Sequence, residues 1–298
     1  MLCFTLASWW QVSKLLFSDQ YSSALYFGYP SALVGWFYGW KVPYVVALRG
    51  ADVPGYNPKF SAYYRLIKPM VALSWKKAKQ VVANSQWLAD LAGNTAQVPI
   101  KIIPNGVDAN LFRSVNETRK FKTFTVTAGG TIPGPKKGLE YLLEGFASFH
   151  QQHPQTELLL FGEGSLNEKL KEQAQQLGVE DAVKFAGQIT HQQLAQQLPR
   201  CHVFCLPSLA EGMSNAMLEA AACGLPIIAT DVGGAKEVVD GNGIIVKTKN
   251  SNEIAQALKK IYADEQLRLR MSKKSREKAE KMGWGEVGGE YLSLLEAS

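Results

Sequence analysis

Two carboxylates, Glu211 and Glu219, stand with seven residues between them in a glycine-rich stretch that runs from residue 207 to residue 239. A carboxylate accepts hydrogen bonds, and two carboxylates held close together select a ligand with several hydroxyl groups. The backbone amides of residues 212–216 lie where a helix begins, which suits an anion such as a diphosphate. The spacing therefore predicts a site for a phosphorylated polyol. The alternative is that Glu211 caps a helix and Glu219 lies on its surface.

The elements around these carboxylates predict where they lie in a fold. The apolar residues 203–206 predict a buried parallel strand. A helix follows, with Ser214 or Asn215 as its N-cap and Gly224 after its last turn. Glu211 then lies in the loop at the carboxyl end of a parallel strand, where open α/β sheets bind ligands.

This stretch closely resembles the E-x7-E signature of retaining, nucleotide-sugar-dependent glycosyltransferases of the GT-B fold, glycosyltransferase family 4. The letters EG at the first glutamate, LEA around the second and CGLPIIATDVGGAKEVV after it all fit. The resemblance implies that Glu211 is catalytic and orients the donor sugar, and that Glu219 binds the ribose. It also implies donor contacts at the helix start, from Gly212, Met213, Ser214 and Asn215.

A basic loop, residues 129–138, follows another predicted strand, and its glycines would let a phosphate approach the backbone closely. It lacks the G-K-[ST] ending of a Walker A motif. It resembles the family's GRL…KG segment, in which an arginine and a lysine hold the donor diphosphate. The resemblance makes Lys137 catalytic and Gly130 a donor contact. Thr131 stands in place of the arginine, and the loop is one residue longer than in the family. We therefore expect weaker or altered diphosphate binding, with Lys136 as the candidate to supply the missing charge. The alternative is a basic surface loop.

Two further turns resemble donor-binding segments of the family. Gly162 and Gly164 match a GxG turn that faces the donor, although many turns between a strand and a helix contain two glycines. Ile189 follows Gly187 and Gln188 at the position where family members touch the nucleobase, largely through backbone atoms.

Residues 1–112 predict strands and helices in the order β-α-β-α-β, hence a parallel sheet. The segments VPYVVALRGADVPGY, VVANSQWLADLA and IIPNGVD resemble the later part of the family's acceptor half. We therefore expect an α/β protein of GT-B type with two Rossmann-like parallel-sheet domains. The N-terminal domain, 1–112, is expected to be incomplete, and 113–285 to bind the nucleotide sugar. A linker is expected near 112–122, and a helix over 286–298 is expected to pack back towards the N-terminal half, with Trp284 as a packing anchor.

The N-terminal half departs from the family pattern in two places. No opening strand with a glycine-rich acceptor loop is visible, and Arg49 stands where many members carry histidine. One hypothesis is a retaining glycosyltransferase that moves a hexose from a nucleoside diphosphate sugar to a glycan or lipid-linked acceptor, as in cell-surface polysaccharide biosynthesis. The other is a non-catalytic or fragmentary nucleotide-sugar-binding protein that lacks a complete acceptor half.

Composition and charge indicate which classes of ligand the protein binds. The hydrophobic fraction of 46% and the charged fraction of 19% are typical of a globular protein. The net charge of +6 favours a phosphorylated substrate or anionic lipid. No nucleic-acid-binding signature is present. The resemblance implies no cofactor and no metal, because the lysine and the helix terminus take the role of a divalent ion.

The cysteines and the N-terminal region indicate the cellular compartment of the protein. Cys3, Cys201, Cys205 and Cys223 show no metal-ligand spacing, and we expect buried reduced thiols in a cytoplasmic protein. Residues 2–17 predict a helix without the features of a signal peptide. Glycines and prolines interrupt the apolar stretch 24–48, so it predicts no membrane span. We favour buried packing for four tryptophans over a patch for peripheral contact with the cytoplasmic membrane face: Trp9, Trp10, Trp36 and Trp40.

Overall fold

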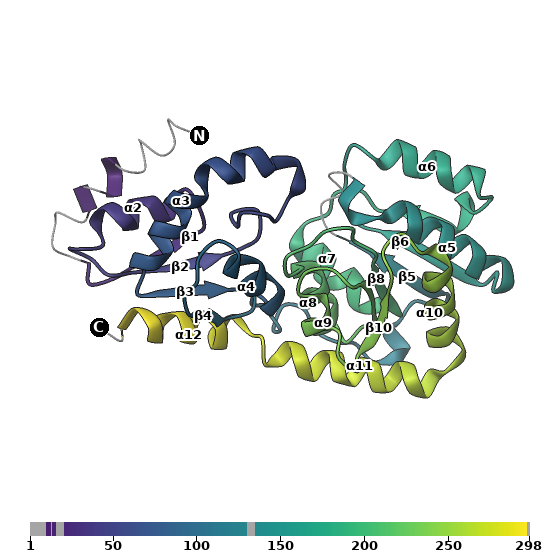
Figure 1. Cartoon of the computed structure of the whole chain (residues 1–298). Coiled ribbons are helices and arrows are strands. Elements are labelled where there is room, and N and C mark those ends of the chain that lie inside the picture. The colour runs from purple at the N-terminus through teal and green to yellow at the C-terminus, as the bar shows by residue number, and fades with distance from the viewer. Residues whose placement is uncertain (1–9, 13, 16–20, 130–134, 297–298) are drawn as a thin grey trace. The chain divides into compact units, whose positions relative to one another are not determined.

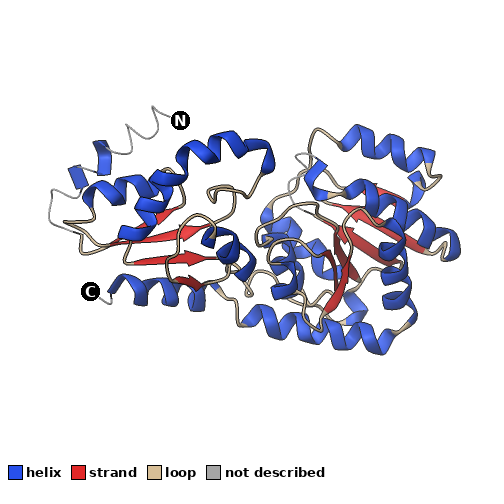
Figure 2. Cartoon of the chain, in the orientation of Figure 1, coloured by secondary structure: helices blue, strands red, loops and turns tan. Residues whose placement is uncertain are grey.

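The chain divides into two compact units in a computed structural model that describes residues 10–12, 14–15, 21–129 and 135–296 (Figure 1). Unit 1 comprises Met1–Asn105 together with Gly285–Ser298, and unit 2 comprises Gly106–Trp284. Each contains a parallel β-sheet with helices against it (Figure 2). The helix expected over residues 2–17 lies largely outside the described residues.

Unit 1 contains a four-stranded sheet in the order β1-β2-β3-β4, and every pairing is parallel, as expected. Its strands are β1 (Ala24–Phe27), β2 (Tyr44–Leu48), β3 (Gln80–Ala83) and β4 (Ile100–Ile102). Its helices are α2 (Ser31–Tyr38), α3 (Ser61–Lys77), α4 (Gln86–Gly93) and α12 (Trp284–Glu296).

Both faces of this sheet are covered, because alternate residues of a strand point to opposite sides. Val46 of β2 packs in a cluster with residues of α2, α3 and α4. Its neighbour Val45 packs on the other side with Val287 and Tyr291 of α12. The C-terminal helix is therefore part of the core of unit 1. Trp284, the expected anchor, is more than half exposed and has its ring against Gly106.

Unit 2 contains a six-stranded parallel sheet in the order β10-β9-β8-β5-β6-β7. Its strands are β5 (Phe124–Ala128), β6 (Thr156–Leu160), β7 (Val183–Phe185), β8 (Val203–Leu206), β9 (Ile227–Thr230) and β10 (Gly243–Val246). Its helices are α5 (Leu139–Gln152), α6 (Asn167–Gln176), α7 (His191–Gln197), α8 (Asn215–Ala222), α9 (Ala235–Val238), α10 (Ser251–Ala263) and α11 (Glu265–Glu280). From β5 the chain adds β6 and β7 on one side, and then adds β8, β9 and β10 on the other side of β5. The direction in which strands are added therefore reverses between the neighbouring strands β5 and β8.

Two apolar clusters fill the faces of this sheet. Val203 and Cys205 of β8 pack with residues of α5, α6 and α10. Phe204 and Leu206 alternate with them and pack with residues of α8 and α9. Both faces of β8 are thus apolar, as its continuous apolar run predicts.

The boundary between the units lies earlier than the predicted linker at 112–122. Phe112 is fully buried and packs with Val107 in a core cluster of unit 2. The chain has therefore entered unit 2 before Phe112, and the changeover falls between Asn105 and Gly106.

Buried packing is wrong for two of the tryptophans. The exposed fractions of Trp10 and Trp40 are 58% and 78%, while Trp36 is partly buried and Trp9 lies outside the described residues. The thiols of Cys201, Cys205 and Cys223 are free and buried, as predicted, and Cys3 lies outside the described residues.

Candidate active site

The loops that follow β5 and β8 are joined where the strand order reverses. The backbone amide of Leu209 donates a hydrogen bond to the carbonyl of Lys136 at 2.7 Å. Gly138 has a φ of 62°, and a Cβ there would lie 2.2 Å from the carbonyl oxygen of Pro207. A side chain at residue 138 would push the loops apart, so this glycine permits the close approach.

This approach brings the two predicted catalytic residues together. The amine of Lys137 forms an ion pair with Oε1 of Glu211. The side chains are 25% and 17% exposed, respectively, so the pair is partly shielded from water. A lysine in such a place can neutralise a phosphate, and the carboxylate can accept hydrogen bonds from hydroxyl groups.

A pair of glycines supports the Glu211 loop from behind. Gly233 has a φ of 55°, and a Cβ there would lie 2.2 Å from the carbonyl oxygen of Glu211. The amide of Gly234 donates to the carbonyl of Gly212 at 2.7 Å. The letters DVGG, which form part of the family resemblance, thus have a positioning role that the sequence did not reveal.

The start of α8 follows this loop directly. Ser214 occupies the N-cap position and is buried, as are Gly212 and Met213, whereas Asn215 begins the helix and is exposed. The first amides of a helix have no partner within the helix. Beside Lys137, this terminus is suited to an anionic ligand.

Glu219, one turn further along α8, faces a cavity of about 370 Å³. Phe161, Gly162, Gln188 and Ile189 are among the residues that line it. Burial raises the pKa of the Glu219 carboxyl above its ordinary value, and the hydrogen bond and charge of His191 oppose this rise. The cavity combines two carboxylates, of Glu163 and Glu219, with apolar side chains, as small-ligand sites commonly combine polar and apolar groups.

His191 is a site residue that the sequence did not suggest. Its Nε2 lies 3.0 Å from Oε1 of Glu219, and its ring meets that of Phe112 edge-on. It begins α7, whose N-cap Thr190 forms a capping box with Gln193. The capping motif predicts the helix start, but no local signal links His191 to a residue of another helix.

Only some of the other residues predicted to contact the donor lie at this cavity. Gly162 has a φ of 107° and donates its amide to the carbonyl of Gly187 at 2.9 Å, so two of the predicted turns meet at the cavity. Gly164 is not among the residues that line the cavity. The side chain of Lys136 is exposed. Gly130 and Thr131 lie outside the described residues.

Unit 1 also has polar side chains after its strands. Nη1 of Arg49, after β2, donates to Oδ1 of Asn105 at 2.6 Å, and Nη2 donates to Oη of Tyr291 at 3.3 Å. Nδ2 of Asn84, after β3, lies 3.4 Å from the same Asn105 oxygen. The two nitrogen donors, from Arg49 and Asn84, thus share one acceptor within unit 1, while the buried Oδ1 of Asn84 has no partner among the described residues.

The described residues contain neither a metal-binding cluster nor a helix that could span a membrane. Among them, no group of three or more His, Cys, Asp or Glu side chains is arranged to hold a metal ion. No described helix has both the length and the apolar character needed to cross a membrane.

Comparison with protein families settles the affiliation of the chain. The model of the family "Glycosyl transferases group 1" matches residues 130–278, which is half of the chain. The chain belongs to this family. The model of "Glycosyltransferase Family 4" matches residues 2–111. Both halves thus agree with the resemblance drawn from the E-x7-E stretch.

Two relatives show how far the likeness to other glycosyltransferases extends. An uncharacterized glycosyltransferase of Methanocaldococcus jannaschii is 25% identical over 273 residues, which cover 85% of this chain and 69% of that protein. The gpi3 subunit of phosphatidylinositol N-acetylglucosaminyltransferase from Schizosaccharomyces pombe is 26% identical over 165 residues, which cover 55% of this chain and 36% of that protein. The chain therefore spans little more than a third of the second relative.

A solved structure shows the fold. HepE of Anabaena in complex with UDP has a TM-score of 0.81 and 22% sequence identity, over 96% of this chain and 82% of that one. The two parallel-sheet units of this group 1 glycosyl transferase therefore have the GT-B architecture, as expected.

Proposed function

We propose that this chain is a retaining glycosyltransferase that moves a hexose from a nucleoside diphosphate sugar to a glycan or lipid-linked acceptor. The observation that supports this best is the convergence of Lys137, Glu211 and the start of α8 at the reversal of the strand order. Open α/β sheets bind ligands at such a point.

In this proposal, Lys137 and the first amides of α8 hold the diphosphate. Lys137 exchanges its partner Glu211 for phosphate oxygens when the donor binds, and the released carboxylate accepts hydrogen bonds from the sugar. The bond from the anomeric carbon to the diphosphate breaks, and a bond to the acceptor hydroxyl oxygen forms. The hydroxyl proton leaves with the nucleoside diphosphate. The lysine and the helix terminus stabilise the negative charge that develops on the leaving group.

The nucleoside lies in the cavity beside Glu219. The carboxylate of Glu219 accepts hydrogen bonds from the ribose hydroxyls, and His191, whose Nε2 is 3.0 Å from Oε1 of Glu219, orients this carboxylate. Ile189 and Gln188, which also line the cavity, contact the base. The complex of HepE with UDP supports a nucleoside diphosphate as the ligand class. The reaction needs no metal in this proposal, because the protein supplies the positive charge.

The name of the S. pombe relative includes phosphatidylinositol, which supports a lipid-linked acceptor. We propose contact with the cytoplasmic face of a membrane, because α3 exposes Leu66, Met70 and Leu73 along one side, with Lys76 and Lys77 one turn after Leu73. An apolar helix stripe flanked by lysines suits an anionic membrane surface.

Transfer kinetics test the proposed site. We expect Glu211→Gln to lower kcat with little change in KM for the donor, and Glu219→Ala mainly to raise that KM, by about 10- to 100-fold. The anomeric configuration of the product, from proton NMR, would be that of the donor. Equal kinetics for the wild type and both variants would refute the site, and an inverted product would refute retention.

Membrane contact has its own test, sedimentation with anionic vesicles. Leu66→Ser combined with Leu73→Ser should weaken vesicle binding. Leu292→Ser on α12, another exposed leucine, should not. Equal binding by all three proteins would refute the contact.

A further inference from the structure

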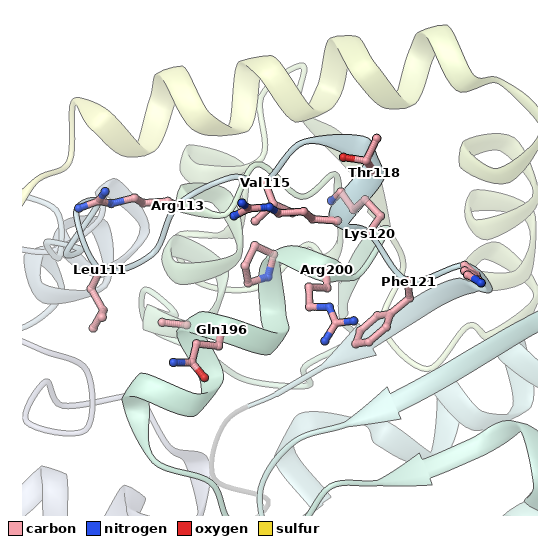
Figure 3. A pocket seen from close by; sticks show the side chains of 12 residues that line it. Leu111, Arg113, Val115, Thr118, Lys120, Phe121, Gln196 and Arg200 are labelled. Carbon is pink, nitrogen blue, oxygen red and sulfur yellow. The ribbon is translucent and has the colours of Figure 1, made fainter.

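A second hollow of unit 2 is lined by residues outside the proposed donor site. It has a volume of about 800 Å³ and lies between the segment that precedes β5 and the α7 region up to the turn before β8 (Figure 3). Its described lining contains five basic side chains and no acidic one. The basic residues are Arg113, Arg119, Lys120, Lys122 and Arg200.

Arg200 is held in place by its neighbour Phe121. The amide of Phe121 donates to the carbonyl of Arg200 at 2.9 Å, and the guanidinium lies over the aromatic ring at 4.3 Å from its centre. Figure 3 shows the two side chains next to each other on one wall. Stacking orders a guanidinium but leaves its N–H groups available at the edge.

Lys120 is a second ordered cation. Its amine donates to the carbonyl of Cys201 at 2.7 Å and is otherwise able to donate two more hydrogen bonds. Burial lowers the pKa of Lys120, and the nearby charge of Glu117 opposes this effect. A partly desolvated amine gains more from an anion than an amine in water does.

These cations are not neutralised by the protein. Among the described residues, none of the five takes part in an ion pair, whereas Lys184 pairs with Glu157 and Lys236 pairs with Asp231 elsewhere in unit 2. Glu117 acts on Lys120 without pairing with it. The pocket thus keeps a net positive charge, which a bound anion would compensate.

We propose that this pocket binds a ligand that carries phosphate groups. One guanidinium group can bind two phosphate oxygens at the same time, and each lysine adds a further positive charge. The volume lies in the usual range for small-molecule sites, and Leu111 and Val115 offer apolar surface for the organic part of such a ligand. A soluble phosphate ester and a phospholipid headgroup share this chemistry.

Two probes separate these sources. Inositol hexakisphosphate is titrated calorimetrically into the full chain, and sedimentation is measured with phosphatidylcholine vesicles, with and without phosphatidylglycerol. Arg200→Gln combined with Lys122→Gln removes two pocket charges. Arg270→Gln combined with Lys169→Gln, both exposed in unit 2 and outside the pocket, is the charge-matched control.

The pocket variant should bind one of the two probes at least about tenfold more weakly than the control does. The probe affected identifies the source. Nucleoside diphosphate binding should be the same in both variants, so that failure of this site is distinguishable from failure of the donor site. Equal weakening in the two variants, or no binding of either probe by the folded wild type, would overturn the proposal.

Discussion

Unit 1 and unit 2 both place polar side chains after parallel strands, but they use them differently. In unit 1 the described strands follow the order β1-β2-β3-β4, and Arg49, Asn84 and Asn105 bond to one another. In unit 2 the order reverses between β5 and β8, and Lys137 meets Glu211 there. The difference teaches that strand order, more than polar composition, determines where the loops after two strands bring a cation and a carboxylate together.

Arg49 of unit 1 and Lys137 of unit 2 also differ in the groups they contact. Arg49 donates to a neutral amide and a neutral hydroxyl, Asn105 and Tyr291. Lys137 is paired with a carboxylate, for which a phosphate is an equivalent partner. We therefore expect substitutions in unit 2 to affect the reaction and those in the Arg49 network to affect mainly stability.

The largest expected effect is that of Lys137→Met. Loss of the charge that stabilises the leaving diphosphate should lower kcat by about 10²- to 10³-fold. Lys169→Met is the matched control, because that side chain is exposed in unit 2 and lies outside the proposed donor site. Steady-state transfer rates measure both. Equal losses in the two variants would contradict a specific role for Lys137.

Gly233→Ala tests the backbone support of the Glu211 loop. Gly178 provides the control, because it has a φ of 67°, close to the 55° of Gly233, but open space where a Cβ would be added. We expect Gly233→Ala to lower the free energy of unfolding by about 1–3 kcal/mol more than Gly178→Ala does, because its Cβ would overlap the Glu211 carbonyl. Urea unfolding measures the difference. A larger loss in Gly178→Ala would show that the loop yields easily.

Acidic pH should lower the folding stability of unit 2 because of His202. Burial, followed by the charges of Lys120 and Arg268, lowers the pKa of His202 from 6.5 to about 4, and its Nδ1 accepts the Thr125 amide. Between these pH values the unfolded chain takes up a proton that the folded chain does not, so stability falls as the pH drops from 6.5 towards 4.

The expected loss is about 2–3 kcal/mol relative to His202→Asn, which keeps an acceptor but does not titrate. Urea unfolding from pH 7 to pH 4 measures it. A stability difference that stays constant over this range would show that His202 titrates normally.

The smallest expected effect is that of Arg49→Lys in unit 1. Loss of the guanidinium bonds to Asn105 and Tyr291 should cost about 1 kcal/mol of stability. Donor affinity should not change. A fall in donor affinity as large as that of Glu219→Ala would break the distinction between the two units.

Several features could be predicted from the sequence because they depend on local patterns. Continuous apolar runs such as 203–206 predict buried parallel strands, and the strands of both units pair in parallel. The roles of Lys137 and Glu211 came from the family resemblance, whereas their contact depends on β5 and β8 being neighbours, which no local pattern predicts.

Other features depend on long-range packing. His191 and Glu219 belong to different helices, and no local pattern connects them. The exposure of Trp40 was also unexpected, because an apolar residue does not indicate whether another element covers it. The early boundary at Asn105 depends on where Phe112 packs, which only the tertiary structure reveals.

Calorimetric titration of the 298-residue chain with a panel of nucleoside diphosphates tests the central claim most directly. The claim is that the crevice at the β5–β8 reversal holds such a ligand. We expect at least one member of the panel to bind the wild type and Arg49→Lys equally, and to bind Glu219→Ala about 10- to 100-fold more weakly. Equal affinity for Glu219→Ala, or no binding by the folded wild type, would contradict the claim.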